Sequence, residues 1–276
     1  MDDSIIKTKS LEFSYDESKQ VLKGIDIDIK RGERIAVLGS NGAGKSTFFL
    51  NLNGVLHPEK GDIYFHGRKM EGSRKDLNEL RKAVGIVFQD ADNQIIASTV
   101  LGEVSFGPLN LNKSKEEVMD IVERALGYMN LLEFKERPPH YLSGGEKKRV
   151  TIADIIAMDS EIFIFDEPTA SLDPVNVDIL HQVMNKLYEE GKTLMISTHD
   201  VDFAYQWAER IIVFCDGKII ADGVPEEIFK DEEILLKANL KKPVLLDIYE
   251  ILDKKGILME NMECPKTVQQ LEKIIK

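Results

Sequence analysis

The sequence predicts an α/β protein with a mostly parallel central sheet, an N-terminal antiparallel β-subdomain and a helical insertion. Unbroken β-rich runs recur at residues 34–38 (RIAVL), 84–88 (VGIVF), 162–166 (IFIFD), 194–198 (LMIST) and 210–214 (RIIVF). Most of these runs are separated by helical stretches, which is typical of a parallel sheet buried between helices. Two further patterns, near the N-terminus and between about residues 90 and 157, predict the other two parts.

The N-terminal part, residues 4–30, alternates apolar and polar residues. The apolar positions with this period of two are Leu11, Phe13, Tyr15, Ile25, Ile27 and Ile29. A period of two predicts antiparallel strands with one face toward solvent.

The middle of the chain has a helical pattern. Ser114 and Glu117 have the spacing of a capping box, before apolar residues on one helix face. Two short amphipathic segments, 243–252 and 268–276, follow Leu240, and they either cover the domain's own surface, the favoured interpretation, or bind a partner. We therefore expect one domain over residues 1–240, with a helical subdomain at about 90–157, and a C-terminal helical extension over 241–276.

Composition excludes several classes of function. Lys and Arg number 36 against 48 for Asp and Glu, so the net charge of −12 disfavours nucleic acid and anionic lipid as partners. No apolar run approaches the roughly 18 residues of a membrane helix, and the first ten residues do not have the layout of a signal peptide. Cys215 and Cys264 lack metal-ligand or disulfide-framework spacing. We expect a soluble intracellular chain that binds no nucleic acid.

The segment GSNGAGKST, residues 39–47, fits the phosphate-loop pattern G-x-x-x-x-G-K-[ST]. It follows a predicted strand and opens a predicted helix, where unpaired backbone N–H groups and the helix dipole favour phosphate. Lys45 is expected to reach the β- and γ-phosphates, and Ser46 to ligate Mg²⁺. The residues predicted to bind the nucleotide here are Gly39, Ser40, Asn41, Gly42, Ala43, Gly44, Lys45, Ser46 and Thr47.

The run IFIFDEP, residues 162–168, contains two adjacent carboxylates after its apolar part. Asp166, at the strand end, suits a role with Mg²⁺, and Glu167 suits polarising water for attack on the γ-phosphate. The alternative is that this acidic pair caps the next helix.

LSGGEKKR, residues 142–149, comes directly before a helical pattern. On its own it could be an ordinary helix start, because Ser143 and Glu146 form a capping box. However, Gly144 and Gly145 would leave bare N–H groups at a positive helix end, which is a second anion site. The sequence thus predicts two phosphate-binding sites for one nucleotide.

With these three motifs in this order, the chain resembles the nucleotide-binding subunits of ATP-binding cassette (ABC) transporters over about residues 4–235. The resemblance implies ATP and Mg²⁺ as cofactors. It also implies a second ATPase subunit, identical or similar, because in that family Ser143, Gly144 and Gly145 of one subunit would close on the γ-phosphate held by the other. This arrangement accounts for the surplus anion site.

The resemblance assigns roles to four further residues, each with an alternative. Tyr15 would stack on adenine, unless it is a core aromatic. Gln89 would sense the γ-phosphate and the metal, and Asp173 would reach across the dimer, unless both are turn caps. His199 would contact the γ-phosphate, unless it is a satisfied histidine at a strand end.

Glu146 departs from the family's commoner LSGGQ. An acid beside a phosphate site is unfavourable, so we expect the Glu146 carboxylate to turn back and accept a hydrogen bond from the Ser143 amide.

Residues 88–111 resemble the corresponding segment of energy-coupling factor (ECF) ATPases, with Asp90 and Ala91 in place of the usual Asn-Pro. The FGPLNL stretch is most similar to the cobalt-ion branch. In ECF machines this segment docks a helix of a separate membrane subunit, and here Ile95, Ile96, Val100, Val104 and Phe106 would form the groove.

The resemblance therefore implies two membrane partners, a coupling subunit and a substrate-binding subunit, with the chain peripheral on the cytoplasmic face of the cell membrane. The expected function is to power import of a micronutrient, with cobalt ion favoured. Import of a B vitamin, nickel or another small solute stays open. The FGPLNL segment is the only evidence against a sugar- or amino-acid-type importer. The single phosphate loop and the net charge of −12 are evidence against a soluble non-transport ABC ATPase.

Overall fold

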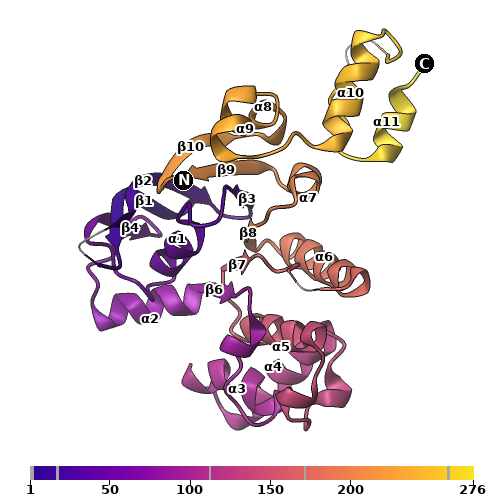
Figure 1. The fold of residues 1–276 in the computed structure, drawn as a ribbon. Coiled ribbons are helices and arrows are strands. Elements are labelled where there is room, and N and C mark those ends of the chain that lie inside the picture. The colour runs from indigo at the N-terminus through magenta and orange to yellow at the C-terminus, as the bar shows by residue number, and fades with distance from the viewer. Residues whose placement is uncertain (1–2, 17–18, 112, 171, 260–261) are drawn as a thin grey trace.

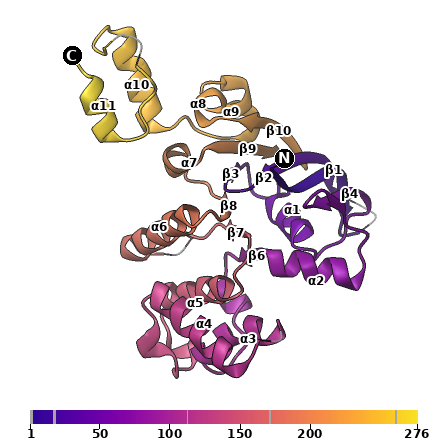
Figure 2. The ribbon, with the colours of Figure 1, turned by 180° about the vertical axis from the view of Figure 1, so that it is seen from behind.

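The computed structural model describes residues 3–16, 19–111, 113–170, 172–259 and 262–276. Two sheets lie at the centre of the molecule, a group of three helices lies beyond one edge, and two C-terminal helices lie beyond the other (Figure 1). The view from behind shows the same arrangement (Figure 2).

The N-terminal sheet is antiparallel, as the alternating pattern predicts. It comprises β1 (Ser4–Ser14), β2 (Gln20–Lys30), β4 (Lys60–Phe65) and β5 (Arg68–Lys69), in the order β2-β1-β4-β5. Each neighbouring pair is antiparallel.

The second sheet contains all five of the unbroken apolar runs. Its strands are β3 (Arg34–Leu38), β6 (Val84–Val87), β7 (Ile162–Asp166), β8 (Thr193–Ser197), β9 (Arg210–Cys215) and β10 (Lys218–Gly223). Their order is β10-β9-β3-β8-β7-β6, and every pair from β9 to β6 is parallel. Only β10 among the described strands of this sheet runs antiparallel to its neighbour. The mostly parallel sheet predicted from sequence is confirmed.

Residues of β3 alternate between two hydrophobic cores. Ile35 and Val37 join the core that contains the antiparallel sheet and α1 (Lys45–Leu52). Ala36 and Leu38 join the core on the opposite face. That second core includes buried residues of α5 (Gly144–Ala157), α6 (Pro174–Glu189) and α7 (Val201–Trp207). Because both faces are covered, the strands need no polar face, which explains their unbroken apolar runs.

The middle of the chain is helical. α3 (Val100–Asn110), α4 (Lys115–Tyr128) and α5 pack together, with three short 3₁₀ turns between elements: η1 (Ala91–Asn93), η2 (Leu132–Phe134) and η3 (Pro139–Tyr141). The capping box predicted for α4 is present, because Ser114 Oγ accepts from the Glu117 amide and Glu117 accepts from the Ser114 amide.

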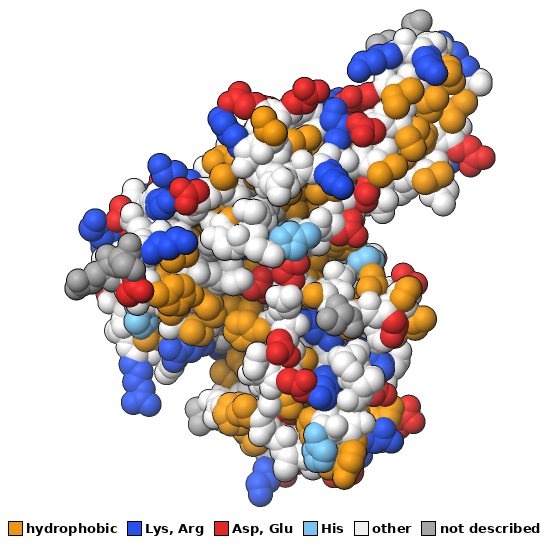
Figure 3. All heavy atoms as spheres, viewed as in Figure 1, with side chains coloured by type: hydrophobic (Ala, Val, Ile, Leu, Met, Phe, Trp, Pro, Cys, Tyr) orange, Lys and Arg blue, Asp and Glu red, His pale blue; other side chains and the backbone are white. Residues whose placement is uncertain are grey.

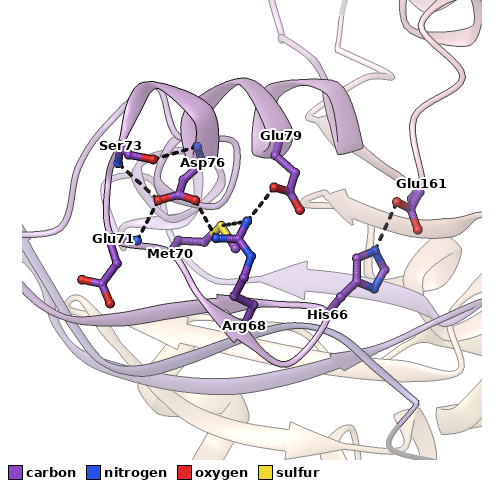
Figure 4. A network of polar contacts seen from close by, with 8 residues as sticks. All are labelled: His66, Arg68, Met70, Glu71, Ser73, Asp76, Glu79 and Glu161. Atoms are coloured by element: carbon purple, nitrogen blue, oxygen red, sulfur yellow. Dashed lines mark hydrogen bonds and ion pairs between the residues drawn. The ribbon is translucent and has the colours of Figure 1, made fainter.

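Helix α2 (Arg74–Ala83) is fixed to β5 by a polar network that the sequence analysis did not predict (Figure 4). Arg68 Nη1 donates to Asp76 Oδ1 at 2.7 Å, and Ser73 caps the helix. The Arg68 guanidinium, followed by the Ser73 hydroxyl, lowers the pKa of Asp76 to about 2. His66 Nε2 lies 3.2 Å from Glu161 Oε1, which joins this sheet to the start of β7. The network therefore anchors the antiparallel sheet at two places.

The C-terminal part contains α8 (Pro225–Ile228), α9 (Glu232–Ala238), α10 (Val244–Lys254) and α11 (Val268–Ile274). Helices α10 and α11 lie side by side, away from the two sheets (Figures 1 and 2), and a Leu258–Ile275 bridge joins their ends. Hydrophobic side chains gather on this extension (Figure 3), where Val244, Ile251 and Val268 are exposed. In the ranges that the structure describes, none of the helices combines the length and the apolar character needed to cross a bilayer.

Candidate nucleotide site

The predicted phosphate loop connects β3 to α1. Gly39 has a φ of +140°, and a Cβ there would lie 2.2 Å from the carbonyl oxygen of Phe214, so only glycine fits. Gly44 is the N-cap of α1 and offers no side-chain cap. The first amides of α1 are therefore open to an anion.

Lys45 lies inside this loop and is only 6% exposed. Its Nζ donates to the carbonyls of Gly39, at 2.6 Å, and Ser40, at 3.2 Å. Burial lowers the pKa of Lys45, while the nearby carboxylates of Glu167 and Asp166 oppose that shift. The ammonium is thus held by the loop at a point where it can meet phosphate oxygens.

A cavity of about 350 Å³ opens in front of the loop. It is lined by predicted site residues: Tyr15, 41–47, Gln89, Asp166 and Glu167. Lys19, Gln20, Val21, Asp216 and Gly217, which were not predicted, also line it. Gly39 and Ser40 contribute through their carbonyls to Lys45 rather than by lining the cavity.

Tyr15 is 62% exposed, so it is not a core aromatic. Its ring packs edge-on against Phe13 with 5.0 Å between centroids, and its hydroxyl lies 3.2 Å from Thr47 Oγ1. The Tyr15 ring thus lines the cavity and is held by contacts to Phe13 and Thr47.

Three oxygen-bearing side chains that line the cavity fit Mg²⁺: the hydroxyl of Ser46, the amide of Gln89 and the carboxylate of Asp166. Mg²⁺ binds oxygen and is often held by one or two carboxylates together with substrate phosphates. Within the described ranges there is no cluster of three or more His, Cys, Asp or Glu residues suited to a metal ion. A Mg²⁺ ion held by these three side chains would need further oxygen ligands to complete six-fold coordination.

Ser197, which was not predicted, holds both acidic residues. Its Oγ donates to Asp166 Oδ1 at 2.5 Å and accepts from the Glu167 amide at 2.9 Å. Glu167 has a φ of +48°, a left-handed conformation that is unusual for a non-glycine residue. Since α6 begins at Pro174 and is capped by Asp173, the alternative that the acidic pair caps the next helix is wrong.

His199 touches both the acidic pair and the phosphate loop. Its Nε2 lies 2.8 Å from Glu167 Oε1 and 2.9 Å from Asn41 Oδ1. The imidazole thus links the end of β8 to the loop after β3, at the carboxyl edge of the parallel sheet where ligands bind.

Asp173 lies outside the cavity and caps α6. Its carboxylate accepts from the Asn176 amide at 2.9 Å and from Asn176 Nδ2 at 2.8 Å. The hydrogen bond from the Asn176 backbone lowers the pKa of Asp173. Within one chain, therefore, Asp173 has the cap geometry of the alternative interpretation.

The LSGGE segment begins α5. Glu146 Oε2 accepts from the Ser143 amide at 2.7 Å, and Ser143 Oγ accepts from the Glu146 amide at 3.3 Å, so the predicted capping box is confirmed. The hydrogen bond from the Ser143 amide lowers the pKa of Glu146. A Cβ at Gly144 would meet nothing within 4 Å, whereas one at Gly145 would lie 2.5 Å from Asn176 Nδ2. The segment therefore presents a bare backbone at Gly144.

Gly144 lines a second cavity, of about 410 Å³, with residues 89–92, Lys147 and Lys148. Gln89 is the one described residue common to the two cavities. In a single chain, the LSGGE segment is thus separate from the cavity of the phosphate loop.

The predicted groove of residues 95–106 is partly wrong. Val100 and Val104 are fully buried in the core of the helical region, because α3 turns them toward α4 and α5. Ile96 is 73% exposed and Phe106 53% exposed. These two side chains remain available to a partner.

A phosphate loop after one central strand, with an acidic pair two strands away, places the chain among P-loop nucleotide-binding proteins. The comparisons with known proteins narrow this class. A family model described as ABC transporter matches residues 22–170. An ABC transporter ATP-binding protein from Methanosarcina mazei is 46% identical over 272 residues, which cover 99% of this chain. This chain spans only 60% of the length of that relative.

An energy-coupling factor transporter ATP-binding protein from Methanocaldococcus jannaschii is 48% identical over 251 residues, covering 91% of this chain and 90% of that protein. CbiO1 from Clostridium perfringens, described as part of the ABC transporter complex CbiONQ, shares 40% identity and superimposes with a TM-score of 0.75, over 91% of this chain and 99% of that one. The chain therefore belongs to the ABC transporter family, and within it to the energy-coupling factor transporter ATP-binding proteins.

Proposed function

We propose that the chain hydrolyses ATP to drive an ECF-type importer, and that it does so as one of two ATPase subunits. The observation that carries the proposal is the convergence of Lys45, Asp166 and Glu167 on one cavity of about 350 Å³. A loop that binds phosphate, a carboxylate for a metal and a second carboxylate for water are the parts that phosphoryl transfer to water needs.

In this proposal the nucleotide occupies that cavity. The amides of residues 41–47 and the Lys45 ammonium bind the phosphates, and Tyr15 stacks on the adenine. Ser46, Gln89 and Asp166 hold Mg²⁺, which when bound neutralises charge on the β- and γ-phosphates.

Glu167 orients the attacking water and accepts its proton. The water oxygen forms a bond to the γ-phosphorus while the bond from that phosphorus to the bridging oxygen breaks, and ADP and phosphate are released. His199, already within hydrogen-bond distance of Glu167, contacts the γ-phosphate. Its placement in the same contact network supports this role.

The separation of the two cavities supports the second subunit. Since Ser143, Gly144 and Gly145 do not reach the nucleotide cavity of their own chain, they contact the γ-phosphate of a partner chain, identical or similar. Asp173, beside them through Asn176, reaches across the same interface.

The membrane partners are a coupling subunit and a substrate-binding subunit, which bring the chain to the cytoplasmic face of the cell membrane. The exposed Ile96 and Phe106 support docking through residues 90–110. Cobalt ion is the first candidate cargo because of the FGPLNL resemblance, and nickel or a vitamin are alternatives. We also propose the domain division expected from the sequence: one domain over residues 1–240, with a helical subdomain at about 90–157, and an extension over 241–276.

The test compares two variants. Glu167→Gln should retain ATP binding, lose turnover by roughly 100-fold or more and accumulate as an ATP-bound dimer, because it spares the phosphate loop. Lys45→Ala should lose about 10- to 100-fold in ATP affinity, because a charge-assisted contact is removed. The measurements are ATP binding, phosphate release and size-exclusion chromatography with Mg·ATP. A Glu167→Gln protein that stays monomeric at saturating ATP would contradict the two-subunit mechanism.

A further inference from the structure

Lys148 is a buried lysine on α5, the helix that the LSGGE segment begins. The residue is 3% exposed, and its Nζ donates to the carbonyl oxygens of Phe88 and Gln89, the latter at 2.9 Å. Those acceptors lie 60 and 59 residues earlier in the chain. The bonds therefore join two distant segments rather than neighbours within one helix.

A buried ammonium is costly unless its donors are satisfied. Lys148 has no ion pair among the residues described, so its ammonium is stabilised mainly by hydrogen bonds to backbone carbonyls. Nearby Asp166 and Asp90 add favourable charge. If the side chain left the two carbonyls, this buried ammonium would lose two hydrogen bonds.

The two carbonyls lie where the chain leaves the central sheet. Phe88 and Gln89 directly follow β6, and the next elements are η1 and α3. The backbone N–H of Phe88 is also bonded, since it donates to Gln94 Oε1 at 3.1 Å. Lys147 adds a more exposed contact to Asp92 Oδ1 at 2.6 Å. The backbone that carries Gln89 is thus bonded both to α5 and to the Gln94 side chain.

Helix α5 begins at Gly144, the bare-backbone residue of the LSGGE segment, only four residues before Lys148. A displacement of the start of α5 relative to the central sheet would therefore carry the Lys148 ammonium and the Gln89 backbone with it. Gln89 is also the described residue common to both cavities.

We infer that Lys148 is a positioning residue: by binding the carbonyls of Phe88 and Gln89, it holds the backbone of Gln89 against α5 at the place from which the Gln89 side chain lines the nucleotide cavity. The inference rests on the metal and γ-phosphate role proposed for Gln89. It goes further by naming the physical link between the LSGGE segment and that role. Lysine suits this link because its long stem carries several N–H donors to two adjacent carbonyls.

The main test is Lys148→Met, which keeps the apolar stem and removes the donors. We expect kcat for ATP hydrolysis to fall roughly tenfold, with KM for ATP and the melting temperature close to those of the unchanged protein. Lys148→Arg, which restores donors and charge, should recover most of kcat. The matched control is Lys192→Met, which removes a lysine paired with Asp159 just beyond the other end of α5 and should leave kcat unchanged.

A double-mutant cycle with Gln89→Ala completes the test. The effects of Lys148→Met and Gln89→Ala on kcat should be strongly non-additive, because both act through the side-chain amide of Gln89. Additive effects of the two changes on kcat would overturn the inference in favour of a purely structural role. If Gln89→Ala alone leaves kcat unchanged, the proposed role of Gln89 fails. If it lowers kcat while Lys148→Met does not, the link fails and the role of Gln89 stands.

To keep the test decisive if Lys148→Met folds poorly, Lys148→Gln supplies a neutral amide donor of shorter reach. Its kcat should fall between those of Lys148→Met and Lys148→Arg. A Lys148→Gln protein with normal stability and unchanged kcat, in the chain that keeps Gln89, would also overturn the inference.

Discussion

His199 Nε2 lies 2.8 Å from Glu167 Oε1, so the histidine after β8 and the acid after β7 form one polar unit across two neighbouring strands. The same nitrogen also lies 2.9 Å from Asn41 Oδ1. Both partners are acceptors, so Nε2 carries the hydrogen. The imidazole can therefore orient Glu167, and in the proposed mechanism it also contacts the γ-phosphate.

This relationship predicts that His199→Ala lowers kcat by roughly 100-fold while changing ATP affinity only a few-fold, because the loop and Lys45 stay intact. His199→Gln, which keeps an N–H donor at similar reach, should retain more activity than His199→Ala. Steady-state phosphate release and ATP binding measure both effects. Equal activity in the two variants would show that donation from residue 199 is unimportant.

Tyr15 should supply adenine affinity through its ring. Base–aromatic stacking contributes about 1–3 kcal/mol, so Tyr15→Ala should weaken ATP binding roughly 5- to 100-fold. Tyr15→Phe keeps the ring and loses only the contact to Thr47, so its affinity should stay within a few-fold of the unchanged protein. The dissociation constants for ATP decide the matter, and equal values for Tyr15→Ala and Tyr15→Phe would rule out stacking.

Much of this fold is visible in the sequence because burial on both faces leaves a clear mark. The five central strands are unbroken apolar runs, and the capping boxes of α4 and α5 have readable spacings. The network of Arg68 and Asp76 was missed, since the contact between a two-residue strand and the next helix depends on how the chain folds back in space. Val100 and Val104 were misplaced because apolar residues at helical spacing look alike whether they face a core or a partner.

Site residues within local sequence motifs could be predicted. Contacts that depend on which strands are neighbours in the sheet could not. Ser197 could not be assigned, because its contact with Asp166 depends on β7 and β8 being neighbours, which sequence does not state. Lys148 did leave a signal. It shares one helix face with Ile152 and Ile155, which are both buried. A lysine on that apolar face must be buried too and needs hydrogen-bond partners.

Asp154 on α5 predicts a pH dependence of stability. Burial, with a contribution from the charge of Glu103 on α3, raises the pKa of Asp154 to about 7. In the unfolded chain its pKa is about 3.9. Between these values the folded state holds a proton that the unfolded state has lost, so this group makes the protein less stable as pH rises from about 4 to about 7.

Asp154→Asn should remove that loss, because the amide is neutral at every pH. We expect the variant to match the unchanged protein near pH 4 and to be more stable by on the order of 2 kcal/mol at pH 8. Melting temperatures across this range measure the difference. A constant difference between the two proteins from pH 4 to pH 8 would show that the pKa of Asp154 is the same in the folded and unfolded states.

The last prediction concerns docking through Ile96. The side chain is 73% exposed, and its position is fixed, because the Ile96 and Ala97 amides donate to the buried carboxylate of Glu103 at 2.9 and 2.7 Å. An exposed apolar side chain on a braced loop fits a helix-binding surface, since little ordering is needed on binding. Ile96→Asp should therefore leave the melting temperature and basal ATPase rate nearly unchanged while blocking co-purification with the membrane subunits.

Two variants separate docking from folding. Val104→Asp, eight residues later and fully buried, should destabilise the protein by several kcal/mol and lose both activity and assembly. Leu236→Asp places the same charge on α9, where the side chain is 83% exposed, and should assemble normally. If Ile96→Asp behaves like Val104→Asp, the loop is part of the folding core. If it behaves like Leu236→Asp, the membrane partner binds elsewhere, and only a stable, active Ile96→Asp protein that fails to assemble supports docking at this loop.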